Sequence, residues 1–177
     1  MLRKILIAIG VIIVAFLAVA AMQPAHFQVE RSMTIAAPDS VLFAQVNDFH
    51  NWNGWSPWAK LDPAMKQNFE GPPSGAGAIY SWAGTSKVGE GRMTITESTP
   101  SSKILIRLEF LKPFSATNTT EFTFTPAAGG TTVKWAMSGE NGFVAKAFGM
   151  VMNMDKTIGG DFEKGLSQMK GVVEGGK

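Results

Sequence analysis

Residues Asp155 to Glu174, DKTIGGDFEKGLSQMKGVVE, decide the fold of this chain. Apolar residues recur there at three- and four-residue steps, so on an α-helix they form one stripe while the charged side chains point elsewhere. The stripe consists of Ile158, Phe162, Leu166, Met169 and Val173. An amphipathic helix of this kind needs an apolar partner, which the rest of the chain must supply.

Short strands between residues 27 and 137 are the predicted partner. Alternating apolar and polar residues predict strands at 27–36, 66–70, 78–83, 91–98, 103–111, 117–125 and 131–137. Hairpin-length connections join the later strands, and a short helix after Pro38 separates them from the first one. The sequence therefore predicts an α+β fold, in which an antiparallel sheet packs on the C-terminal helix.

Composition limits the possible chemistry. The chain has 177 residues, enough for one domain and a terminal segment, and its net charge of +2 comes from scattered basic residues. Nucleic-acid binding is not indicated, because it needs clustered basic surface. With no cysteine and only two histidines, the sequence predicts neither a metal site nor a cofactor.

The N-terminal segment is long enough to cross a membrane. Ile5 to Met22 reads ILIAIGVIIVAFLAVAAM, without a charge, and Arg3 and Lys4 precede it. A membrane-spanning helix needs about 20 apolar residues, whereas the apolar part of a signal peptide has about 7 to 15. Residues 1–24 are therefore predicted to be a transmembrane helix that contacts the membrane through residues 5–22, and residues 25–177 a separate domain. The alternative is a signal peptide cleaved after Ala20, which would release a secreted domain.

The basic residues predict the orientation of this helix. Arg3 and Lys4 would stay in the cytoplasm, so the domain would lie on the periplasmic or extracytoplasmic side.

Two further features leave alternatives open. Trp52, Trp55 and Trp58 lie in the irregular segment DFHNWNGWSPW, where they can plug one end of the core, form the walls of a ligand entrance, or do both. Arg31 falls on the apolar face of the first strand. Either it lies near the strand end and reaches water, or it lines an internal cavity.

Two segments carry a family resemblance. VERSMTIAAPDSVLFAQVNDFHNWNGWSPW at 29–58 and MDKTIGGDFEKGLSQMK at 154–170 resemble the opening and closing segments of START-like, helix-grip proteins, specifically a membrane-tethered bacterial subgroup of the polyketide cyclase/dehydrase-like (SRPBCC) proteins. The resemblance spans about residues 27–173. It implies a curved antiparallel sheet wrapped around the long C-terminal helix, with a cavity between them for lipids, polyketides or other hydrophobic molecules.

The first functional hypothesis is membrane-anchored binding or transport of a hydrophobic small molecule or lipid in that cavity, without catalysis. No hydrolase, phosphate-binding or metal-binding motif is present. Gly165 lies beside the apolar stripe, so a leucine there is expected to disturb packing or ligand occupancy. The expected ligand-binding residues are Trp52, Trp55, Trp58, Tyr80, Trp82, Ile106, Phe110, Phe122, Trp135, Met150, Met154, Phe162 and Gly165.

Two other hypotheses remain. One is a cyclase/dehydrase-like or hydrolytic enzyme that uses His50, or an Arg31 and Glu97 pair, on an apolar substrate in the same cavity. The other is a protein-interaction domain whose core is filled. The sequence does not indicate the identity of a ligand or the oligomeric state.

Overall fold

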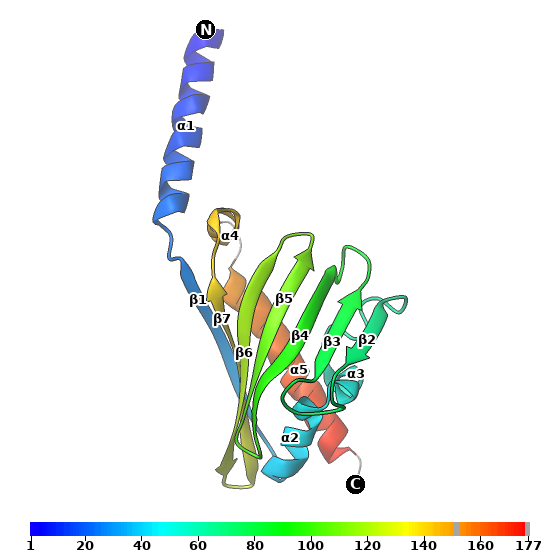
Figure 1. Ribbon diagram of the computed structural model, residues 1–177. Coiled ribbons are helices and arrows are strands. Elements are labelled where there is room, and N and C mark those ends of the chain that lie inside the picture. The colour runs from blue at the N-terminus through cyan, green and yellow to red at the C-terminus, as the bar shows by residue number, and fades with distance from the viewer. Residues whose placement is uncertain (151–152, 176–177) are drawn as a thin grey trace.

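The computed structural model describes residues 1–150 and 153–175 (Figure 1). A long N-terminal helix stands apart from a curved sheet, and a second long helix crosses one face of that sheet. The elements are α1 (Leu2–Met22), β1 (His26–Ile35), α2 (Asp39–Asn47), η1 (Phe49–Asn51), α3 (Trp52–Trp55), β2 (Lys66–Glu70), β3 (Ile79–Ala83), β4 (Glu90–Thr99), β5 (Lys103–Lys112), β6 (Ala116–Ala127), β7 (Gly130–Glu140), α4 (Phe143–Gly149) and α5 (Met154–Glu174).

The strands form one antiparallel sheet in the order β1-β7-β6-β5-β4-β3-β2. Successive antiparallel pairings join β2 through β7, and β1 forms the other edge of the sheet by pairing with β7. The predicted α+β helix-grip architecture is confirmed: the curved sheet holds α5 against one face, with α2 and α3 beside it (Figure 1).

The strand register defines two ends of the sheet. At one end His26 pairs with Glu140, Asn118 with Gly139, and Glu90 with Lys112. This is the α1 end, because α1 joins β1 there; it also carries α4 and the β3–β4 and β5–β6 loops. The far end carries the β6–β7 hairpin and the β4–β5 turn.

The helix α5 packs on a row of residues that runs across the sheet. Arg31 on β1 pairs with Trp135 on β7, which pairs with Phe122 on β6. Phe162 of α5 stacks on Trp135, with ring centroids 4.2 Å apart and an angle of 10° between the rings. The predicted apolar stripe therefore meets the sheet, and buries Phe162, Leu166 and Met169 completely or nearly so.

Two glycines let the backbone of α5 approach this row. A Cβ atom on Gly165 would lie 2.7 Å from Cζ3 of Trp135 and 3.1 Å from Cδ of Pro57. A Cβ atom on Gly159 would collide with the guanidinium group of Arg31. Because real side chains do not tolerate such distances, only glycine allows the close contact at either position.

The tryptophan-rich segment forms two short helical turns, η1 and α3, where the sequence predicts irregular structure. The indole N–H of Trp52 donates to the carbonyl oxygen of Val46 at 3.0 Å, and that of Trp55 donates to Gln45 O at 3.1 Å. Both acceptors belong to the last turn of α2, whose carbonyl groups have no partner within the helix. These indole donors therefore fasten α2 and are occupied within the fold.

The glycines of α5 give the first testable prediction. Gly165→Ala should lower the free energy of unfolding by about 1–3 kcal/mol, because the new methyl group would overpack the contact with Trp135. Gly160→Ala is the matched control. No atom lies within 4 Å of its added Cβ, so it should raise the free energy of unfolding by about 0.5–1 kcal/mol. Urea titrations followed by tryptophan fluorescence measure both; equal effects would contradict the close approach of α5.

Candidate functional site

Aromatic side chains pack together between the sheet and α5, where the sequence predicts a ligand. Trp135 lies at the centre of this packing, with Phe122 4.8 Å away and Trp55 5.6 Å away between ring centroids. The indole N–H of Trp135 is buried there without a hydrogen-bond partner. The predicted ligand-binding residues that are buried in this cluster are Trp52, Trp55, Ile106, Phe122, Trp135, Phe162 and Gly165.

A second aromatic group lies toward the β2 edge of the sheet and is half-buried. Tyr80 stacks on Trp82 with centroids 5.9 Å apart, and Trp82 meets Phe110 edge-on at 6.2 Å. The indole N–H of Trp82 donates to Val88 O at 3.0 Å. Burial raises the pKa of the Tyr80 phenol, so this group is neutral at physiological pH. Trp58 is also half-buried and packs edge-on against Trp135.

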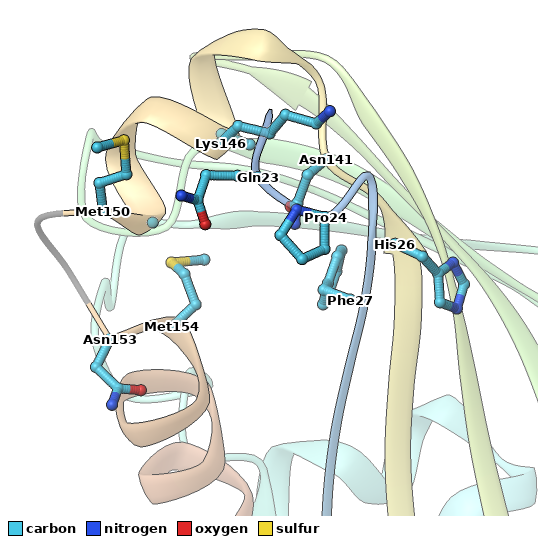
Figure 2. A pocket seen from close by; sticks show the side chains of 11 residues that line it. Gln23, Pro24, His26, Phe27, Asn141, Lys146, Met150, Asn153 and Met154 are labelled. Atoms are coloured by element: carbon cyan, nitrogen blue, oxygen red, sulfur yellow. The ribbon is translucent and has the colours of Figure 1, made fainter. Parts of the chain in front are cut away.

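A cleft of about 510 Å³ opens at the α1 end (Figure 2). It lies between the α1–β1 linker, the ends of β1 and β7, α4 and the first residues of α5. Figure 2 shows Gln23, Phe27 and Met154 around the central space, whereas His26 and Asn153 point away from it. The lining residues are Gln23, Pro24, His26, Phe27, Asn141, Ala145, Lys146, Gly149, Met150, Asn153 and Met154.

The cleft combines an apolar wall with a polar rim. Phe27, Met150 and Met154 supply the wall, and methionine adapts its shape to different apolar surfaces. Lys146 supplies a positive charge at the rim. This arrangement suits an amphiphile whose polar group is neutral or acidic. The sequence predicts Met150 and Met154 as ligand-binding residues. It does not predict Phe27, Gln23 and Lys146, because residues 23–27 meet residues 141–150 and 153–154 only in the fold.

The helix α1 is long and apolar enough to cross a membrane by length and composition, properties that a signal sequence shares. Its C-terminal part contacts α4, and Ala20 is fully buried. The linker continues into the sheet, since Asn141 N donates to Ala25 O.

Arg31, in the middle of β1, forms ion pairs with two residues of α5. Its Nε donates to Glu163 at 2.7 Å, and its two terminal nitrogens donate to the Asp155 carboxylate at 3.0 and 3.1 Å. The guanidinium group thus lies over Gly159, between carboxylates four residues to either side. The hydrogen bond to Asp155, followed by that to Glu163, raises the pKa of Arg31, and the same contact lowers the pKa of Asp155.

Neither sequence interpretation of Arg31 describes this position. β1 continues to Ile35, so Arg31 does not lie at the strand end, and its partly exposed side chain pairs with acidic groups of α5.

Glu97 pairs with Lys103 at 2.8 Å, and this contact lowers the pKa of Glu97. A β-bulge at Thr96 shifts the register between Ile95 and Glu97. One extra residue reverses the alternation of side chains, so Ser98 bonds to Asn47 of α2 and Glu97 faces outward. Arg31 and Glu97 therefore have different partners.

His50 lies in another part of the fold and contacts neither Arg31 nor Glu97. Its Nδ1 lies 2.7 Å from Oδ1 of Asp48, its ring stacks on Phe69 at 4.1 Å, and its side chain is exposed. Asp48 Oδ1 also accepts from the backbone N–H of His50, as an N-cap of η1 does. Among residues 1–150 and 153–175, no three His, Asp or Glu side chains are grouped to hold a metal ion.

A buried carboxylate joins two loops at the α1 end. Asp62, in the segment before β2, accepts from Thr85 N at 2.7 Å and from Ala64 N at 3.1 Å. The backbone hydrogen bond from Thr85 lowers the pKa of Asp62. Asp62 thereby fixes the β3–β4 loop to the segment between α3 and β2.

Comparison with known proteins identifies a family with this architecture. Residues 26–174 match the model of a family described as polyketide cyclase/dehydrase and lipid transport. No curated protein matches the sequence.

Similar solved structures share the fold at low sequence identity. A protein from Rhizobium leguminosarum has 13% identity and a TM-score of 0.62, with 84% of this chain and 95% of that chain covered. Protein CV1439 from Chromobacterium violaceum has 14% identity and a TM-score of 0.58, with 85% and 99% covered. The di-domain ARO/CYC StfQ from the steffimycin biosynthetic pathway has 12% identity and a TM-score of 0.61, with 85% of this chain and 51% of that chain covered.

The lowered pKa of Asp62 predicts a pH-dependent stability. Because its pKa is lower in the folded than in the unfolded chain, the ionised carboxylate stabilises the fold above a pH of about 4, and this contribution is lost as the pH falls through the folded pKa. In Asp62→Asn, the free energy of unfolding should therefore fall less steeply below that pH than in the parent chain. Urea titrations at a series of pH values measure both slopes; identical slopes would show that Asp62 does not contribute.

Proposed function

This chain belongs to the polyketide cyclase/dehydrase and lipid transport family, and we propose that its domain binds an amphiphilic lipid or other hydrophobic small molecule at the α1 end. The single observation that carries this proposal is the cleft of about 510 Å³, because its size lies in the range of about 300–1,000 Å³ that small-molecule sites occupy. The apolar part of the ligand would contact Phe27, Met150 and Met154, and its polar part would lie near Lys146.

The position of the cleft also supports a membrane-anchored function. α1 leaves the domain beside the cleft, and its length suits the hydrocarbon core of a bilayer (Figure 1). We propose that residues 5–22 span the membrane, with Arg3 and Lys4 in the cytoplasm and the domain on the opposite side. A domain held in this way would take up or deliver a lipid at the membrane surface. If the segment is instead a cleaved signal peptide, the same cleft would belong to a secreted domain.

We propose binding without catalysis. His50, Arg31 and Glu97 pair with three different sets of residues, and none of them lines the cleft. A general acid or base must lie within hydrogen-bonding reach of the group on which it acts. An amphiphile in the cleft would therefore meet none of these three candidates.

One observation favours a second candidate function. The rings packed around Trp135 lie between the sheet and α5, where the family resemblance implies a ligand, and such packing suits a protein-interaction domain with a filled core. In that case the chain would carry no small molecule.

Mass spectrometry of molecules that co-purify with the full chain distinguishes the two functions. Extraction from membranes in mild detergent, followed by separation of the protein, should recover an amphiphile in stable proportion to the chain. Met154→Gln should reduce this recovery, because it places an amide in the apolar wall of the cleft.

Val172→Gln is the matched control, since Val172 is similarly exposed at the other end of α5 and should leave recovery unchanged. Recovery of no small molecule from the parent chain would favour the protein-interaction function. Equal recovery from both variants would remove the cleft as the binding site.

A further inference from the structure

Exposed hydrophobic side chains gather at the α1 end of the domain. Leu111 near the end of β5 is 56% exposed and Phe114 in the β5–β6 loop is 66% exposed, and in α4 Phe143 is 49% and Val144 53% exposed. Leaving large apolar side chains in water is unfavourable, and a group of them marks an interaction surface. We call Leu111, Phe114, Phe143 and Val144 the apolar rim.

The sheet brings the two halves of the rim to the same end. β5 ends at Lys112 and β6 begins at Ala116, while α4 follows the end of β7. Because Asn118 near the start of β6 pairs with Gly139 near the end of β7, both segments lie beyond the same edge of the sheet (Figure 1). In the described part of the domain, the exposed large hydrophobic residues away from this end are Val41 and Val172.

The length of the linker sets how far this end can lie from α1. α1 has 21 residues, so it is about 31 Å long and matches a hydrocarbon core of about 30 Å. Met22 ends α1 and His26 begins β1, so the connection between them can span at most about 14 Å. The headgroup layer of a bilayer is about 5–7 Å thick on each side. A domain on so short a tether has its α1 end at the membrane surface.

The charges at this end suit anionic lipid headgroups. Three segments there carry a lysine that can meet a lipid phosphate: Lys60 before β2, Lys87 in the β3–β4 loop, and Lys146 in α4. Three of the acidic groups nearby are engaged: Glu90 pairs with Lys112 at 2.9 Å, Asp155 pairs with Arg31, and Asp62 is buried. Glu140 is exposed beside His26.

We propose that the apolar rim docks on the surface of the bilayer that holds α1, with its four side chains among the headgroups and the lysines against anionic phosphates. This inference rests on the proposal that α1 spans the membrane. Docking in this way would also place the cleft at the bilayer surface. Met150 and Met154 of its apolar wall lie beside α4, so a lipid could enter the cleft directly from the bilayer.

The experiment uses the full chain reconstituted in nanodiscs. The chain contains no cysteine, so Phe114→Cys and Val144→Cys each create one site for a fluorescent label. Ala128→Cys is the matched control, because it is exposed at the far end in the β6–β7 hairpin. The nanodiscs contain lipids with a nitroxide on the acyl chain, which quenches fluorophores at the membrane. We expect quenching at positions 114 and 144 and none at 128.

Lipid composition and charge variants test the role of the lysines. Quenching at 114 should be stronger in mixtures of phosphatidylcholine and phosphatidylglycerol than in phosphatidylcholine alone. Lys87→Gln and Lys146→Gln should each weaken docking about fivefold in the mixture, since one basic residue near an anionic surface contributes on that order.

Other outcomes would overturn the proposal. Equal quenching at 114 and 128, or none at 114 and 144, shows that the rim does not contact lipid. A label at 114 that is shielded from water but not quenched, and more so at high protein concentration, identifies a second copy of the chain as the occupant. Loss of the unlabelled chain from nanodiscs in alkaline carbonate shows that α1 is not embedded, in which case the anchoring proposal fails before docking is tested.

Discussion

The close approach of α5 to the sheet is the constraint on which the rest of the structure depends. At Gly165 the helix backbone meets the ring of Trp135, and at Gly159 it passes beneath the guanidinium group of Arg31. Stacking of Phe162 on Trp135 and the pairing of Arg31 with Asp155 and Glu163 then fix the helix along and about its axis. Because the rings touch the helix directly, the centre of the domain is packed.

This packing determines where the domain can be open. α5 lies against β1 and the ring of Trp135, and the cleft opens where this packing ends, because α5 begins at Met154, at the α1 end. α4 lies over this opening and also contacts α1. The cleft, the apolar rim and α1 thus share one end of the molecule, and a change in the position of α4 would affect all three.

Most of the fold could be predicted from the sequence, because the strands of one buried face alternate and α5 has a clear helical stripe. The tertiary details could not. The bulge at Thr96 reverses the side chains after it, so Glu97 faces outward although alternation places it inside. The cleft is lined by residues from 23–27, 141–150 and 153–154, and no local pattern in the sequence indicates that these segments meet. One sequence pattern did indicate the ion pairs of Arg31. Asp155, Gly159 and Glu163 recur at four-residue steps, which places two carboxylates on one helical face with a glycine between them.

The direct passage of α1 into β1 has a mechanical consequence. A pull on the membrane segment would be transmitted along β1, whose ten residues pair with β7 from His26 to Ile35. The hydrogen bonds of an antiparallel pair run perpendicular to the strands. Tension along β1 would therefore shear the whole ladder at once instead of opening it one bond after another. Arg31 adds ion pairs from the same edge strand to α5, so the strand that receives the force is tied both to β7 and to the C-terminal helix.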